Sequence, residues 1–276
     1  MKRKTIKRKI GYLLVIVGIA LPLSGFLQIS FNELSKDANY NKFIELQKNK
    51  EESTKEEENK KAIDYNKSIK GEVNAIDPFE ARDYKTSNDI QKNSDEVFAY
   101  ISIPALDIKK PIYIGATDAN MAKGVATIEG TALPIGEKNT RAVIAGHRGY
   151  YRDLMFLNVE ELKENDEILI DRAGKTLKYR VVGFEVVNPN EWEKLEPVQG
   201  KEMITLLTCH PLKPPRRQRL LVNAERVYEE KKESTVKNVE PKKSASNRKL
   251  LVYIVSIVGI LLELIVIVSF IKFLAF

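Results

Sequence analysis

The sequence has little of several residue types that common functional sites need. Only one cysteine and two histidines occur among its 276 residues. A single cysteine excludes a disulfide within the chain, and no cluster of candidate ligands has the spacing of a metal site. The chain also lacks a glycine-rich loop of the kind that cradles phosphates. We therefore expect no metal, nucleotide, haem or other cofactor.

Its basic residues do not form the pattern of a nucleic-acid-binding protein. The formal net charge is +7, but no basic run is interleaved with aromatic residues. An excess of positive charge suits the anionic surface of a membrane better. We therefore expect the chain to associate with a membrane and to bind no nucleic acid.

Long apolar runs stand near both ends of the chain. Residues 10–30 carry no formal charge and are long enough to cross a bilayer, and only Glu263 interrupts the second run, residues 250–271. Residues 1–9 hold six Lys or Arg residues, which predicts that the N-terminus stays in the cytoplasm. Residues 272–276 then form a second cytoplasmic tail, and the intervening chain is extracellular. A cleaved signal peptide is the alternative for the first run.

The composition of the intervening chain changes at residue 97. Residues 31–96 are rich in Lys, Glu and Asn, which predicts one or two solvated helices. Residues 97–228 show short apolar runs between Gly, Pro, Asn and Asp residues, the pattern of an all-β barrel or sandwich. Residues 158–164 predict a short helix, and the polar residues 229–249 predict a flexible tether. Strands are predicted at residues 97–103, 110–114, 124–128, 142–145, 167–171, 177–187, 203–209 and 219–227.

Cys209 ends a run that predicts a buried strand. Composition alone leaves two interpretations, an inert apolar filler or a reactive thiol. A thiol attacks as the thiolate, which a nearby cation such as Arg219 favours. His147 lies in a glycine loop 62 positions upstream of Cys209, and imidazole can exchange protons near neutral pH. These residues form a candidate acyl-transfer site, although a surface histidine and a solvated strand arginine remain the alternatives.

Three motifs surround these residues. Residues 205–209 read Thr-Leu-Leu-Thr-Cys, residues 145–149 read Ala-Gly-His-Arg-Gly, and residues 219–222 read Arg-Leu-Leu-Val. They resemble the TLxTC signature, the histidine loop and the arginine strand of sortases, the membrane-bound cysteine transpeptidases of Gram-positive bacteria. The resemblance spans roughly residues 99–227. It implies an eight-stranded β-barrel with short helices, preceded by a helical and lid segment and flanked by two transmembrane helices.

Another stretch resembles one class of this family. Asp77-Pro78-Phe79 reads by itself as an ordinary Asp-Pro turn. It resembles the lid of class C sortases, which build pili, and the layout of two spans around an outer domain also resembles that class. We therefore interpret Asp77, Pro78 and Phe79 as a lid, with Asp77 paired to Arg219 and Phe79 against the Cys209 sulfur.

The resemblance implies catalysis by Cys209, His147 and Arg219. The enzyme would cleave an LPXTG-like sorting signal through a thioacyl-enzyme and pass the acyl group to a lysine amine of a pilin subunit. Two alternatives remain open, anchoring of surface proteins to a cell-wall peptide amine and an inactive membrane-tethered binding module. The loop after Cys209 is longer and more basic than is usual in class C, so Arg216 and Arg217 are rival cations to Arg219.

Overall fold

The computed structural model describes residues 2–69, 77–80, 96–150, 152–189, 191–228 and 241–275. Two compact units make up the chain. The first contains Met1–Ser35, Tyr151–Asp153 and Lys243–Phe276, and the second contains Lys36–Tyr150 and Leu154–Lys242.

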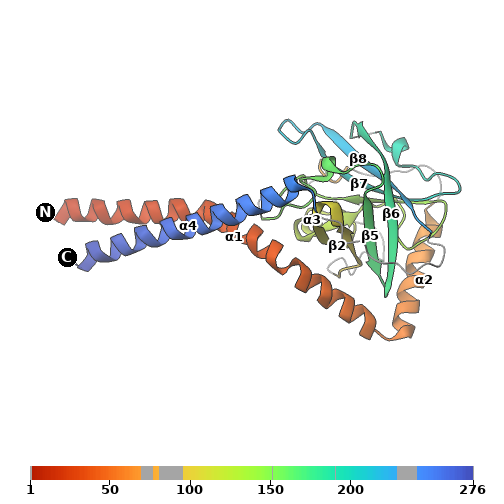
Figure 1. Ribbon diagram of the computed structural model, residues 1–276, viewed down its shortest axis with the longest axis horizontal. Coiled ribbons are helices and arrows are strands. Elements are labelled where there is room, and N and C mark those ends of the chain that lie inside the picture. Colours follow the sequence, from red (N-terminus) through yellow and green to blue (C-terminus); the bar gives the residue numbers. More distant parts are fainter. Residues whose placement is uncertain are drawn as a thin grey trace. The chain divides into compact units, whose positions relative to one another are not determined.

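The second unit is built on a closed eight-stranded barrel (Figure 1). Its strands are β1 (Ala99–Ile103), β2 (Ile108–Ile114), β3 (Val125–Thr127), β4 (Thr140–Ala145), β5 (Glu167–Arg172), β6 (Lys175–Val187), β7 (Glu202–His210) and β8 (Gln218–Arg226). They follow one another around the barrel in the order β1-β2-β3-β4-β7-β8-β6-β5. The predicted all-β barrel is confirmed, and each predicted strand end lies within two residues of an observed one.

The directions of the strands decide which residues meet at one end of the barrel. β4 and β7 pair in parallel, whereas β7 and β8 pair antiparallel. The C-terminal ends of β4 and β7 therefore lie beside the N-terminal end of β8. Cys209 is at this end of β7, His147 follows the end of β4, and Arg219 is the second residue of β8.

The strands around the site are buried on both faces. On β7, Ile204 and Leu206 belong to one apolar cluster, whereas Leu207 belongs to a second. Because successive side chains of a strand point to opposite faces, the two clusters lie on the two sides of the sheet. Double burial explains why apolar residues occupy both faces of β7 at Ile204, Leu206 and Leu207.

Short helices complete the barrel. They are η2 (Pro104–Leu106), α3 (Asp118–Lys123), η3 (Val159–Glu161) and η4 (Trp192–Leu195). The helix predicted over residues 158–164 is thus a single 3-10 turn. Leu195 of η4 belongs to the second cluster, and Trp192 and Phe79 pack against it. Residues from the β6–β7 connection and from the 77–80 segment therefore cover the same side of the sheet.

Two helices precede the barrel, α1 (Lys2–Asn49) and α2 (Glu52–Ser68). α1 joins the predicted span and the predicted solvated helix without a break, because a change of composition does not interrupt backbone hydrogen bonding. α2 packs on the barrel unit through Ala62 and Tyr65, which cluster with Leu133. Asn66 fixes this contact, since its side chain exchanges two hydrogen bonds with the Leu133 backbone. Residues 70–76 and 81–95 lie outside the described residues.

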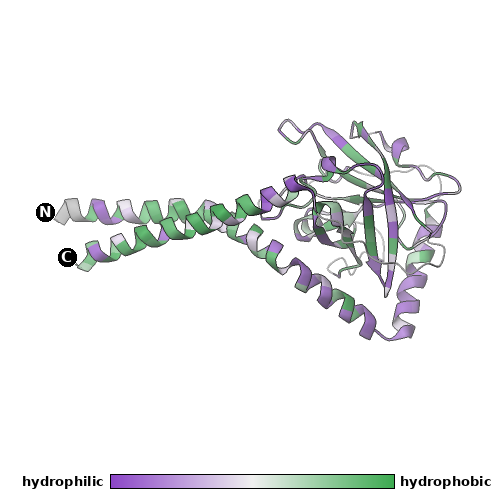
Figure 2. Ribbon diagram, in the orientation of Figure 1, coloured by the Kyte–Doolittle hydropathy of each residue, from purple (hydrophilic) through white to green (hydrophobic). Residues whose placement is uncertain are grey.

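In the first unit, α4 (Lys243–Ala275) runs antiparallel to the N-terminal part of α1, so both described ends lie together (Figure 1). Ser30 and Ser256 share a hydrogen bond of 2.9 Å between their hydroxyls, and Gly259 leaves room for the Leu23 side chain. Both helices are long and apolar enough to cross a membrane (Figure 2). Residues 243–249 of the predicted tether are helical, and residues 229–240 lie outside the described residues.

Candidate active site

The register of the barrel brings the predicted site residues together. Cys209 and Arg219 are direct cross-strand partners in the β7–β8 pair. The loop after β4 lies along the end of β7, since the Gly146 amide donates to the Leu207 carbonyl at 3.1 Å. The hydroxyl of Thr208 in turn donates to the Gly146 carbonyl at 2.7 Å. His147 is therefore held at the strand end that bears the thiol.

Each glycine of the histidine loop occupies a position that other residues fit poorly, for a physical reason. A Cβ on Gly146 would meet the Phe156 ring at 2.6 Å, so this position needs a residue without a side chain. Gly149 has a φ of +79°, in the left-handed region that glycine adopts without strain. The loop can therefore approach Phe156 and turn as it does only because glycines occupy these two positions. Composition alone would assign them to an ordinary turn.

Residues 77–80 lie over this strand end. Asp77 accepts a hydrogen bond from Arg219 Nε at 2.7 Å, and the two side chains are 4% and 3% exposed. The Phe79 amide donates to the other carboxylate oxygen of Asp77 at 2.8 Å. The Phe79 ring contacts the Arg219 guanidinium, with 5.3 Å to the ring centroid. It also meets the His147 ring edge to face, with 5.9 Å between centroids.

Tyr150 also contacts the imidazole, a contact that sequence reasoning missed. Its ring stacks on His147 with 4.8 Å between centroids and 14° between planes. His147 is thereby in contact with one ring from the barrel loop and one from the 77–80 segment. The one signal for this contact in the sequence was the proximity of Tyr150 to His147. Aromatic residues near loops are too common for that proximity to single out Tyr150.

Burial dominates the electrostatics of the two titratable groups. It raises the pKa of the Cys209 thiol, and the charge of Asp77 raises it further, whereas Arg219, Arg216 and Arg148 lower it. Burial also lowers the pKa of His147. With residues 77–80 in place, the site therefore favours a neutral thiol beside a neutral imidazole.

The rival cations occupy different positions from Arg219. Arg216 and Arg217 are exposed, whereas Arg219 is buried opposite Cys209. The Arg216 carbonyl accepts a hydrogen bond from Arg219 Nη1 at 3.2 Å, and Arg216 Nε donates to the Leu212 carbonyl. Arg216 therefore helps to orient Arg219 through its backbone, and its own guanidinium points to another carbonyl.

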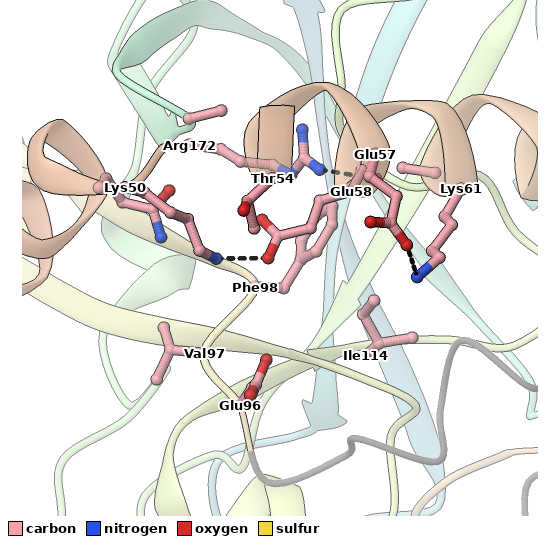
Figure 3. A pocket seen from close by; sticks show the side chains of 13 residues that line it. Lys50, Thr54, Glu57, Glu58, Lys61, Glu96, Val97, Phe98, Ile114 and Arg172 are labelled. Atoms are coloured by element: carbon pink, nitrogen blue, oxygen red, sulfur yellow. Dashed lines mark hydrogen bonds and ion pairs between the residues drawn. The ribbon is translucent and has the colours of Figure 1, made fainter. Parts of the chain in front are cut away.

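A cavity of about 500 Å³ lies beneath α2, away from Cys209 (Figure 3). Its lining includes Arg172, which ends β5, and strand pairing makes β5 run in the same direction as β8. The cavity is thus at the barrel end opposite the start of β8. Its charges pair with one another, as Lys61 does with Glu57 at 2.7 Å. Neither Cys nor His is among the described residues that line it, so we do not assign the chemistry to it.

Among the described residues, no group of three or more His, Cys, Asp or Glu side chains is arranged to hold a metal ion. The arrangement at the end of β7 instead offers a thiol, an imidazole and a guanidinium. Together these groups can supply a nucleophile, a proton carrier and a hydrogen-bond donor for an oxyanion.

Comparison with known proteins identifies the family. The family model of the sortase domain matches residues 101–227, which include all three motifs. The structure is similar to sortase C-3 from Streptococcus pneumoniae, with 32% identity, a TM-score of 0.64, and coverage of 79% of this chain and 98% of that one. It is also similar to sortase A from Corynebacterium diphtheriae, with 33% identity, a TM-score of 0.62, and coverage of 74% and 97%.

The sequence is 31% identical over 118 residues to sortase A from Bacillus anthracis, which covers 43% of this chain and 54% of that relative. The match thus spans about half the length of the relative. Together with the closed barrel and the three matching motifs, these similarities show that the chain belongs to the sortase family of cysteine transpeptidases.

Proposed function

We propose that this chain is a membrane-anchored transpeptidase in which Cys209 is the nucleophile. The observation that supports this most strongly is the position of the chain's one cysteine directly opposite Arg219, at the strand end to which the histidine loop is hydrogen-bonded. A buried filler thiol would need no such partners. The basic residues 1–9 favour an orientation with both termini in the cytoplasm and the barrel outside.

In the proposed reaction, the Cys209 sulfur attacks the carbonyl carbon of the threonine in an LPXTG-like sorting signal. His147 takes the proton of the Cys209 thiol and gives it to the leaving amine as the peptide C–N bond breaks, and a thioester remains on Cys209. Arg219 donates hydrogen bonds to the oxyanion that forms on the way. An incoming amine then attacks the thioester and gives up a proton, and the Cys209 thiol is restored.

We further propose that the incoming amine is a lysine of a pilin subunit. The Asp-Pro-Phe stretch over the site and the two apolar helices support this assignment, as does the similarity to a sortase C. The similarity to two sortases A supports the alternative, a cell-wall peptide amine. An inactive membrane-tethered module is the third candidate.

Polymer formation distinguishes these functions. The full chain in detergent is incubated with a pilin that bears an LPXTG-like signal, with or without an excess of a glycine-ended wall peptide, and the products are separated on a denaturing gel. Pilus polymerisation predicts a ladder of covalent pilin multimers without the peptide. A single peptide adduct and no ladder would indicate wall anchoring instead. No product under either condition would favour the inactive module.

We propose that Asp77 and Phe79 act as a lid, and their removal is expected to speed modification of Cys209 by a small thiol reagent. Asp77→Ala removes the ion pair with Arg219 and the negative charge that raises the pKa of Cys209. The rate-versus-pH midpoint should therefore move to lower pH. Phe79→Ala removes the ring over Arg219 and His147 and should act mainly through access.

Asp64→Ala, at an exposed carboxylate on α2, is the matched control and should label like the natural chain. Cleavage of a short sorting peptide should not slow in either lid variant, because a lid restrains the site and takes no part in the chemistry. Unchanged labelling of Cys209 in both variants would show that residues 77–80 are an ordinary surface turn.

A further inference from the structure

The residue after His147 is unusual for a glycine loop, because its charged side chain is almost completely buried. Arg148 is 1% exposed. A guanidinium away from water is costly unless every part of it finds a partner. Its Nε donates to the Leu157 carbonyl at 3.2 Å, its Nη1 donates to the Cys209 carbonyl at 3.4 Å, and its Nη2 forms an ion pair with Glu160.

Arg148 and its partners lie on three separate segments of the chain. Arg148 itself belongs to the histidine loop, Leu157 and Glu160 lie just before η3 and within it, and Cys209 is the penultimate residue of β7. The same η3 segment also holds the backbone next to Arg148, since the Phe156 amide donates to the His147 carbonyl at 3.0 Å. The side chain therefore links the backbone of the proposed nucleophile to the loop that carries the proposed proton carrier.

The link through Arg148 matters most when the lid opens. Asp77 and Phe79 hold Arg219 and His147 only while residues 77–80 lie over the site. Substrate must displace that segment, and these contacts are lost at the moment when the thiol and the imidazole have to act together. The three contacts of Arg148 involve none of residues 77–80, so they persist when the lid opens.

We propose that Arg148 is a positioning residue for the transpeptidation, which ties the backbone of Cys209 to the histidine loop and keeps the thiol and the imidazole in register during turnover. This inference rests on the proposed function, in which Cys209 and His147 react with substrate. A fixed geometry matters because a misplacement of about 1 Å at a reacting group can cost about a hundredfold in rate.

The guanidinium has a second effect on the same thiol. Its positive charge lowers the pKa of Cys209, as do Arg219 and Arg216, and Asp77 opposes them. Glu160 lies against the far side of the Arg148 guanidinium and is 37% exposed, so water screens its negative charge in part. The positioning effect of Arg148 and the effect of its charge can be separated by experiment, because lysine keeps the charge but cannot reproduce three directed contacts.

The test compares Arg148→Met, Arg148→Lys and Glu160→Gln in the full chain in detergent. Arg180→Met, at an exposed arginine on β6, is the matched control. Two measurements are made on each variant. One is the rate of Cys209 alkylation against pH without substrate, and the other is kcat and KM for a sorting peptide. A thermal melt identifies any variant that does not fold.

We expect kcat to fall by about tenfold to a hundredfold in Arg148→Met and Arg148→Lys, with KM little changed. The alkylation midpoint should move to higher pH in Arg148→Met but stay near that of the natural chain in Arg148→Lys. Glu160→Gln should lower kcat in the same direction by a smaller factor, and Arg180→Met should change neither quantity.

Full restoration of kcat in Arg148→Lys would contradict the positioning role of Arg148, because its positive charge alone would then account for the effect. A folded Arg148→Met chain with natural kcat and natural alkylation midpoint would overturn the whole proposal. If the natural chain cleaves no peptide, the proposed function has failed instead. The alkylation profiles still report the contact between Arg148 and Cys209 in that case.

Discussion

Replacing Cys209 by alanine is expected to abolish both cleavage of a sorting peptide and covalent joining of subunits. The chain has no second thiol, so no other residue can form a thioester. Loss of a covalent nucleophile typically costs about 10⁶-fold in kcat. Cys209 is half-buried at a strand end, and its truncation should leave the barrel folded. The measurement is peptide cleavage by the full chain, with a thermal melt to verify folding.

Cys209→Ser sharpens this test. A serine hydroxyl has nearly the same shape but ionises far less readily than a thiol, so this variant should also be inactive within the sensitivity of the assay. Turnover by either variant near that of the natural chain would contradict covalent catalysis by Cys209. Binding of the sorting peptide should survive in both, because each change replaces only the small side chain of Cys209.

Alanine at His147 and alanine at Arg219 are expected to lower kcat by different routes. His147→Ala removes the proton carrier, an effect of about 10²–10⁴-fold. Arg219→Ala removes a donor to the oxyanion, an effect of about 10²–10³-fold. Arg219→Lys should recover little activity, since an ammonium cannot copy the planar guanidinium. Steady-state cleavage of a sorting peptide measures all three.

Two further measurements test whether Arg219 is the cation that stabilises the oxyanion. Arg216→Ala should retain most activity, because the contribution of Arg216 to orienting Arg219 comes from its backbone carbonyl. Arg219→Ala should also loosen the lid, because Asp77 loses its buried partner, and should move the pH midpoint of Cys209 labelling to higher pH, because the charge of Arg219 lowers the pKa of the thiol. A crippled Arg216→Ala beside a normal Arg219→Ala would show that the cation was assigned wrongly.

The strands of the barrel were predictable because local sequence patterns indicate which strands are buried and where they end. Apolar side chains occupy both faces of β7, with Ile204 and Leu206 in one cluster and Leu207 in the other, as a strand buried on both faces requires. Pro104 ends β1 and starts η2, which matches its inability to continue a strand. The closure of the sheet was beyond these patterns, since pairing of β1 with β5 joins residues that are far apart in the sequence.

The residues missed by sequence reasoning are those whose roles depend on burial. Arg148 follows a histidine in a glycine loop, where an arginine usually faces water. It is buried where its Nε and Nη1 donate to the carbonyls of Leu157 and Cys209 and its Nη2 forms an ion pair with Glu160. Tyr150 similarly gains its role only when the loop folds its ring onto His147. No local pattern distinguishes either residue from an ordinary surface side chain.

The pairing of Asp77 with Arg219 was suggested by the resemblance of Asp77-Pro78-Phe79 to the class C lid. The opposite charges of the two residues fit that pairing, but the stretch by itself reads as an ordinary turn. The Phe79 ring contacts Arg219 and His147. Its suggested contact with the Cys209 sulfur stays a prediction.

One measurement tests covalent catalysis most directly. The full chain in detergent is mixed with an LPXTG-like peptide, quenched in acid, digested and examined by mass spectrometry. We predict a thioester between the Cys209 sulfur and the peptide fragment that ends at threonine, which disappears when an amine is added before the quench. Cleavage of the peptide with an adduct on a different residue, or with Cys209 unmodified throughout turnover, would contradict the account.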